Sequence, residues 1–545
     1  MNPKSFDAVS LGIMWDRLVS LVDEIVSTLV RTSFSTIVNE SYDLTCVVLD
    51  AEGNSIAQGT FSVPVFIGSA PITLRHMLER FPPETLKPGD VIFTNDPWLG
   101  TGHLYDITMA RPVFRKGRVV AYTLSITHLP DIGGSGFGSS AVEVYHEGLR
   151  LPICKLYEEG RLNELVVEII RTNVRVPEQV MGDVMANVAC NEVGGRELLA
   201  FMDEYGLNDL TDLSRAIRGQ SEAAMREKIR ELGQGTHRNQ IQVEGFDGPC
   251  DYVVSIDVKR DSVAYDFTGT SGCVRAAVNV PFCYTNAMAL HAIKSLLLPT
   301  IPNNAGSIAP ISVFAPPGCI LNAQHPFATG GRHAMGHFVT PLIYGALAQA
   351  LPDRVQADSG MMNLINFQGV RRDDRPFSTL YFGAGGYGAL RNLDGWCTLP
   401  HPSNMATVPV EVWETLTHTT IESKRLLPDT GGPGQWRGGL GQEVVLRNDT
   451  GHLITTLGMG NRTMFPARGM FGGGDGSLRA HSIDGTPVHA KGRNELGPGQ
   501  RMRIVEAGGG GLGDPKARAR AALAEDVSQG YVSRQAASDI YGWSD

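Results

Sequence analysis

The sequence predicts a multidomain α+β protein, with an N-terminal mixed α/β part built around one long hairpin, a helical middle and a glycine-rich β C-terminal part. Its 545 residues are many for one hydrophobic core. Strand-like runs and helical spacing alternate up to residue 380, and the 63 glycines concentrate beyond it. The expected segments are 1–160 (α+β domain), 161–235 (helical), 236–380 (α+β domain), 381–515 (glycine-rich β domain) and 516–545 (C-terminal helical tail).

Each element is expected from a local pattern. Helices are predicted where apolar residues recur every three or four positions, and strands where Val, Ile, Thr and Tyr cluster or alternate between turn residues. In chain order they are helix Val9–Arg31; hairpin strands Asp43–Asp50 and Ser55–Phe61; helix Ala70–Arg80; strand Val91–Asn95; hairpin strands Ile107–Phe114 and Arg118–Ile126; helices within Glu164–Leu232; strands within Ile241–Gly269; helix Asn286–Leu298; strand Ser312–Phe314; helix Gly336–Leu351; and two short helices within Ala517–Trp543.

The composition excludes several classes of function. The net charge is -10, from 47 basic and 57 acidic residues without a basic block, which argues against nucleic-acid binding and a polybasic membrane patch. The eight cysteines form no C-x-x-C pair, so we expect reduced thiols and no cysteine-based zinc site. The first residues lack a signal-peptide pattern, and no apolar run reaches the roughly 20 residues of a membrane span. A cytoplasmic protein is expected.

Two His-x-x-Asp units, His103/Asp106 and His128/Asp131, flank the predicted hairpin of residues 107–126. The hairpin would bring the two units together at its open end, although they are distant in sequence. Imidazole nitrogen with carboxylate oxygen is a ligand set that suits zinc, manganese or ferrous iron. Glycines on both sides would let the backbone approach an ion closely. The sequence therefore favours a metal-bearing hairpin over the alternative of two hydrogen-bonded surface pairs.

The register of this hairpin sets which side chains meet. Counting outward from a tight turn at residues 116–117 pairs Asp106 with Thr127 and Tyr105 with His128. In that register the two units lie side by side, and the third ligand comes from the neighbouring strand.

Other polar residues are candidates for the same site. Asp43 and Glu40 lie just before the first predicted strand, so either could supply a carboxylate; alternatively, Asp43 caps the strand and Glu40 is a solvated charge. In the loop after residue 138, Glu143, His146 and Glu147 could orient a substrate, unless they are ordinary exposed charges.

The segment ATGGRHAMGHF, residues 328–338, leads into a predicted apolar helix. Two glycines before Arg332 and His333 would place backbone N–H groups and a cation at the helix N-terminus, an arrangement that holds phosphate or carboxylate. An ordinary glycine-rich start of a helix explains the same residues equally well.

The glycine-rich region contains FGAGGYGALRNLDG, DTGGPGQWRGGLGQ, MFGGGDGS and EAGGGGLGDP. None has the Gly-Lys-Ser/Thr of a Walker loop, and none fits the dinucleotide-binding fingerprint, so no nucleotide site is expected. We expect these glycines to form turns of a β-rich domain, with some loops bordering the active cavity.

In order along the chain, the motifs ESYDLTCVVLDAEG, PGDVIFTNDPWLGTGHLYDI, THLPDIGG, EVYHEGLRLP, DTGGPGQWRGGLG and GGGGLGDP resemble the hydantoinase B family over essentially the whole chain. This family comprises the B-type subunits of ATP-dependent hydantoinases, 5-oxoprolinases, caprolactamases, and acetone and acetophenone carboxylases. The resemblance implies a hetero-oligomer with a kinase-like A-type subunit, which binds ATP and magnesium and phosphorylates the carbonyl oxygen of the substrate.

The resemblance also implies a divalent metal in this chain, zinc or manganese, with iron as an alternative. The family's ligand pattern falls on His103, Asp106 and His128. It adds an acidic fourth ligand, which is Asp43, or Glu40 as the alternative.

Five further residues receive roles through the implied reaction. Asp131 and His146 are candidate proton acceptors, and His333 is a further catalytic candidate. Arg332 and His337 are candidate substrate-binding residues, in a segment where many family members carry Gly-Gly-Asn and no histidine pair.

The implied reaction is hydrolysis of a cyclic amide. Phosphorylation of the carbonyl oxygen creates a good leaving group, and a metal can lower the pKa of a bound water from ~15.7 toward neutrality, so that this water could attack the carbon. The first hypothesis is the B-type subunit of an ATP-dependent hydrolase of hydantoins, lactams or oxoproline. The second is the corresponding subunit of an ATP-dependent ketone carboxylase. A third is a non-catalytic chain that stabilises the kinase-like subunit.

Overall fold

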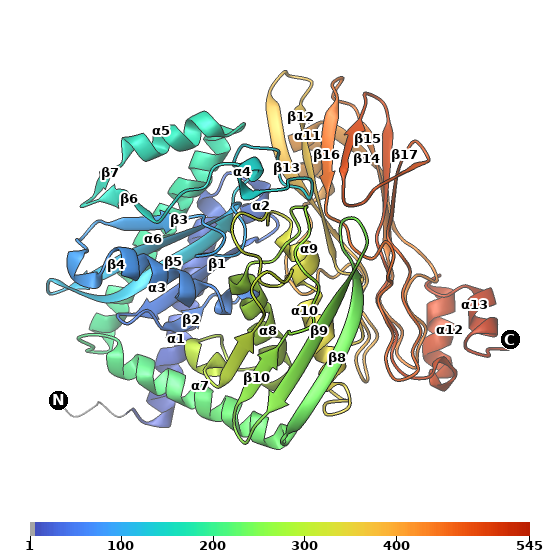
Figure 1. The fold of residues 1–545 in the computed structure, drawn as a ribbon, viewed down its shortest axis with the longest axis horizontal. Helices are drawn as coiled ribbons and strands as arrows, with labels where there is room; N and C mark the ends of the chain where they lie inside the picture. The colour runs from blue at the N-terminus through green and yellow to red at the C-terminus, as the bar shows by residue number, and fades with distance from the viewer. Residues whose placement is uncertain (1–5, 545) are drawn as a thin grey trace.

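A seven-stranded antiparallel sheet forms the N-terminal part of the computed structural model, which describes residues 6–544 (Figure 1). Residues 1–5 and 545, the outer ends of the first and last expected segments, lie outside the described chain. The strand order is β2-β1-β5-β4-β3-β6-β7. The strands are β1 (Leu44–Asp50), β2 (Ser55–Gln58), β3 (Val91–Thr94), β4 (Asp106–Arg115), β5 (Arg118–His128), β6 (Cys154–Glu158) and β7 (Arg161–Leu162).

Helices bury both faces of this sheet. Thr123, Ser125 and Thr127 of β5 are bonded to one of these helices, α6, through asparagine side chains and a backbone carbonyl. Because side chains alternate along a strand, Ile126 and His128 face the opposite side, toward α3 and η1. The helices of this half are α1 (Ala8–Thr32), α2 (Thr36–Asn39), η1 (Pro64–Ile67), α3 (Ala70–Arg80), η2 (Pro83–Thr85), α4 (Val144–Glu147), α5 (Glu164–Asn173), α6 (Pro177–Glu204) and α7 (Thr211–Leu232).

The middle of the described chain contains a four-stranded sheet and four helical segments. Its strand order is β11-β10-β9-β8, with β10 and β11 parallel. The helix predicted at residues 336–351 is shorter, as α10, and a separate single turn, α9, lies between it and the glycines. The elements are β8 (Gly235–Glu244), β9 (Pro249–Val258), β10 (Val263–Asp266), α8 (Phe282–Leu297), η3 (Ala305–Ile308), β11 (Ile311–Phe314), α9 (Arg332–Gly336) and α10 (Val339–Leu347).

Two further sheets and a helical tail complete the described chain. The sheets have the orders β13-β12-β16-β19 and β14-β15-β20-β17-β18, and two short helices end the chain at one corner of the molecule (Figure 1). The elements are β12 (Met362–Val370), β13 (Pro376–Ala384), α11 (Val410–Thr417), β14 (Thr419–Leu426), β15 (Gln442–Asn448), β16 (Ile454–Gly458), β17 (Ala480–Ile483), β18 (Thr486–Val488), β19 (Arg493–Leu496), β20 (Arg501–Val505), η4 (Pro515–Ala517), α12 (Arg520–Ser528) and α13 (Arg534–Asp539).

Helices and several sheets confirm the α+β class, whereas the expected segment limits stay predictions. One hydrophobic core runs from the N-terminal sheet through α8 to β12, and β13 crosses the expected limit at residue 380. Within residues 6–544, no helix combines the length and the apolar character that crossing a bilayer requires.

The glycine-rich segments are extended and lie side by side, which corrects the expectation that these glycines form turns. Their backbones hydrogen-bond to one another: Gly439 N donates to Tyr387 O at 2.8 Å, and Gly509 N donates to Gly439 O at 2.9 Å. A Cβ atom on Gly508 would lie 1.7 Å from the carbonyl oxygen of Thr430. Glycine is required because any side chain would separate these backbones.

Gly508→Ala is therefore expected to destabilise the C-terminal half by about 3 kcal/mol or more, because a rigid backbone carbonyl occupies the position of the new methyl group. Thermal unfolding followed by circular dichroism would measure the loss. The matched control is Gly219→Ala in α7, where a Cβ meets nothing within 4 Å. Equal melting temperatures for both variants would contradict this account of the packing.

Candidate metal centre

Three adjacent strands bring one imidazole and two carboxylates to the same end of the N-terminal sheet. Asp43 directly precedes β1, Asp106 begins β4, and His128 ends β5, which lies between those strands. Asp106 is directly opposite His128, and His128 N donates to Asp43 O at 3.2 Å. The three side chains therefore start from neighbouring positions at one end of the sheet.

A β-bulge sets this arrangement and corrects the predicted register by one residue. Val113 pairs with Ala121 but Phe114 pairs with Val119, so Val120 is an extra residue in β5. Beyond the bulge, Asp106 lies opposite His128 instead of opposite the preceding threonine. Since side chains alternate between faces, a shift of one residue decides whether the histidine shares a face with Asp106.

His103, in the loop before β4, completes a possible metal-binding triad with Asp106 and His128. One potential ligand atom from each of these three buried residues lies within 4.8 Å of the other two. His103 Nε2 is 2.8 Å, and His128 Nδ1 is 3.2 Å, from Asp106 Oδ1. His103 Nε2 is nevertheless a buried atom without an aligned hydrogen bond. Nitrogen and oxygen atoms that converge in this way fit a shared cation.

The charge states of these groups also suit a divalent ion. Burial, reinforced by the nearby Arg332, lowers the pKa of His103 to about 4, so this imidazole is neutral at physiological pH. Burial would raise the pKa of Asp106, but His103 and Arg332 outweigh it and hold the pKa well below its usual range. Burial raises the pKa of Asp43 to about 6. Neutral imidazole and ionised carboxylate are the forms that bind metals.

Arg332 approaches the triad from α9 and is held by the protein itself. Its Nη2 donates to Asp106 Oδ2 at 2.8 Å, and its Nε donates to the carbonyl oxygen of Thr101 at 2.6 Å. Its guanidinium also covers the Tyr284 ring at 4.0 Å. Two of its nitrogens bond within the protein, and α9 is a single short turn, so the structure favours the alternative of an ordinary glycine-rich helix start over an anion-holding terminus.

His333 and His337 line the same pocket as the triad. His333 Nε2 is buried and has no hydrogen-bond partner among the described residues, and burial together with His337 lowers its pKa well below the usual value. His337 Nε2 lies 3.1 Å from the hydroxyl of Tyr284. The fold thus brings residues about 200 positions apart in sequence to one site.

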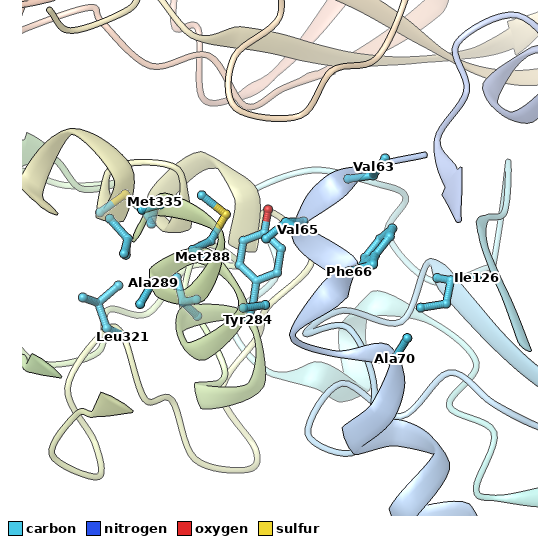
Figure 2. Packing of buried hydrophobic residues seen from close by; sticks show 14 of the residues in the cluster. Val63, Val65, Phe66, Ala70, Ile126, Tyr284, Met288, Ala289, Leu321 and Met335 are labelled. Carbon is cyan, nitrogen blue, oxygen red and sulfur yellow. The ribbon is translucent and has the colours of Figure 1, made fainter. Parts of the chain in front are cut away.

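The rest of the pocket lining is largely apolar and comes from five segments of the chain. Figure 2 shows Tyr284 and Met288 of α8 beside Val65 and Phe66 near η1. The remaining apolar lining residues are Val63, Phe137, Met362, Leu364, Pro402 and Met405. The free volume is about 30 Å³, which is enough for about two water molecules.

The family model of hydantoinase B/oxoprolinase matches residues 7–515 of this chain. The chain belongs to the hydantoinase B/oxoprolinase family. This confirms the resemblance found in the sequence motifs.

The chain is similar to other proteins in both sequence and structure. It is 29% identical to caprolactamase subunit beta of Pseudomonas jessenii, over 98% of this chain and 96% of that protein. The crystal structure of the ATP-dependent caprolactamase from the same organism matches with a TM-score of 0.91 and 26% identity, covering 99% of this chain and 96% of that chain. An acetone carboxylase structure shares the fold at a TM-score of 0.86 and 18% identity, covering 97% and 79% of the two chains.

Three residues that the sequence suggested for the site do not line the pocket. Asp131 accepts hydrogen bonds from Arg175, through Nη1 at 2.7 Å and the backbone N at 2.5 Å. The side chain of His146 is exposed, and Glu40 does not line the pocket. The expectation that Asp131 and His146 face the cavity is corrected, because the arginine engages the first and the turn of α4 directs the second to solvent.

Sequence reasoning missed part of the site in this family member. It did not single out Phe137, whose ring packs against His128, or Tyr284, whose ring lies beside His337. For Glu147 it offered a substrate-orienting role or an exposed charge, and the second is wrong because Glu147 is only 2% exposed. A usable signal was present, because Val144 and Glu147 are three residues apart and share one face of a helical turn. Phe137 and Tyr284 have no local signal, since only the fold brings them to the triad.

Proposed function

We propose that this chain is the metal-dependent B-type subunit of an ATP-dependent cyclic-amide hydrolase, acting on a substrate that a kinase-like A-type subunit has phosphorylated. The observation that carries the proposal is the convergence of His103, Asp106 and His128, with Asp43 as a fourth candidate ligand, in one buried pocket. The apolar residues that line the same pocket suit the methylene carbons of a lactam ring.

The similarity to caprolactamase supports hydrolysis over carboxylation. Caprolactamase is similar to this chain in sequence and in structure, over nearly the full length of both proteins. Acetone carboxylase, at 18% identity, shares the fold alone. The name "subunit beta" of the caprolactamase chain supports an assembly with a second subunit, to which we assign ATP and magnesium.

The residues of the pocket have distinct roles in the proposed reaction. A bound divalent ion of zinc, manganese or iron supplies a Lewis acid that lowers the pKa of water. Arg332 fixes the orientation of Asp106 and offsets its charge. His333, neutral because of its burial, offers a free Nε2 that can accept a proton as water attacks. His337 and Tyr284, which lie within hydrogen-bonding distance of each other, contact the substrate beside it.

A ring-shaped substrate needs more room than about 30 Å³, so the apolar lining must move when it binds. Met288, Met362 and Met405 contribute flexible side chains to that lining. Their rearrangement would enlarge the pocket without disturbing the metal ligands on the sheet.

The test is product analysis with the assembled A/B pair, ATP and a panel of lactams, hydantoins and ketones, with and without bicarbonate. We expect a lactam to give the ring-opened amino acid, heavier by one water and independent of bicarbonate. A ketone product heavier by one carbon dioxide, formed only with bicarbonate, would establish the carboxylase instead. Turnover that persists after complete metal removal would leave only the scaffold role.

A further inference from the structure

Glu147 is a buried acid behind the candidate metal centre. It lies on α4, a single helical turn where Val144 and Glu147 point inward and Tyr145, 67% exposed, points outward. It does not line the pocket, and the hydrogen bonds of its side chain among the described residues go to none of the candidate ligands. A carboxyl group buried in this way needs a hydrogen-bond donor, and that partner lies on another segment of the chain.

That partner is the loop that leads into α9. Glu147 Oε1 accepts hydrogen bonds from the backbone N of Thr329 at 2.8 Å and of Gly330 at 2.5 Å. Gly330 has no side chain, and a Cβ there would lie 3.0 Å from the same carboxyl oxygen. The carboxyl group thus holds two consecutive peptide groups from a segment about 180 residues further along the chain.

The same loop contacts the triad on its other side. The carbonyl oxygen of Gly330 lies 3.2 Å from Nδ1 of His103. A carbonyl at this position can only accept, so it selects the tautomer with the proton on Nδ1 and leaves Nε2 free. Nε2 is the atom that lies 2.8 Å from Asp106 Oδ1. Glu147, the loop and His103 therefore form a continuous chain of contacts.

We propose that Glu147 is a positioning residue for the metal centre: by holding the peptide groups of Thr329 and Gly330, it fixes the carbonyl that orients His103 toward the ion. This inference rests on the proposed metal site. Partners that orient a ligating histidine commonly change metal affinity 10- to 100-fold when they are removed.

The carboxyl group acts here as a hydrogen-bond acceptor, without a requirement for negative charge. No cationic side chain pairs with it in the described structure, and burial raises its pKa to about 8 against the opposing backbone hydrogen bonds. A glutamine has the same length and a carbonyl oxygen that can accept from both N–H groups. Glutamine should therefore replace Glu147, whereas a side chain without an acceptor should not.

The experiment measures the dissociation constants of zinc and manganese for the full chain by calorimetry, after metal removal with a chelator. We expect E147Q to bind within about threefold of the unchanged chain, and E147A to bind roughly 10- to 100-fold more weakly. E147M fills the same volume without an acceptor and replaces E147A if that variant does not fold. Glu143→Ala, an exposed acid beside the same turn, is the matched control and should bind unchanged.

Cobalt(II) absorption gives a second measurement, because its bands report ligand geometry independently of affinity and turnover. E147A or E147M should shift these bands, and E147Q and Glu143→Ala should not. Unchanged affinity and bands in both acceptor-free variants would overturn the role of Glu147 alone. Absence of metal binding by the unchanged chain would overturn the proposed metal site, and this inference with it.

Discussion

His103→Ala is expected to remove stoichiometric metal from the protein and to lower kcat/KM of the assembled enzyme by roughly 10²- to 10³-fold. One of three converging ligands disappears, and the two that remain cannot hold an ion firmly in place. The loss of a Lewis acid that contributes several kcal/mol to the transition state corresponds to a rate effect of this size. Metal content by atomic emission and steady-state kinetics provide the two measurements.

The matched control for this prediction is His76→Ala in α3, a histidine that pairs with an exposed glutamate and does not line the pocket. It should keep its metal content and its turnover. If His103→Ala lost the metal but retained full turnover, the metal-dependent reaction would have to be abandoned. The chain would then be a partner that only stabilises the kinase-like subunit.

Arg332→Gln is expected to destabilise the metal-free protein by about 3–5 kcal/mol, because it leaves Asp106 as a buried charge without its guanidinium partner. A divalent ion would supply the missing positive charge. Saturating zinc or manganese should therefore restore more stability to this variant than it adds to the unchanged protein. Thermal unfolding with and without metal measures both effects.

The comparison variant is Arg196→Gln, which removes an exposed arginine from a surface ion pair. Its stability should change by less than about 0.5 kcal/mol, and metal should make no difference to the change. If both arginine variants unfolded at the same temperature, the ion pair of Arg332 with Asp106 would not have its proposed importance.

Elements with a strong local signal were predictable from the sequence. The helix expected at Ala70–Arg80 has those bounds in the structure, and the one expected at Val9–Arg31 is longer by one residue at each end. Both depend on periodic apolar residues that lie close together in the chain, so no distant contact is needed to specify them. The helix expected at Gly336–Leu351 was wrong in extent: α10 covers only Val339–Leu347, and Gly336 is the last residue of the separate turn α9.

The members of the candidate triad were also recognisable, because His103 and Asp106 occur in one short unit and a hairpin returns the chain to His128. The sequence did not reveal that the side chains of Asp106 and His128 share one face of the sheet. The extra residue at Val120 shifts the register, and a count from the turn alone cannot detect a bulge within the strand.

The sequence by itself determined the local elements, the family and the residue types that can bind a metal, since these depend on neighbours in the chain. Tertiary structure alone decided that Arg332 holds Asp106, that Glu147 supports His103 from behind, and that the glycine segments pack together. Those contacts join segments far apart in sequence, and their formation depends on packing and burial in three dimensions rather than on local propensity.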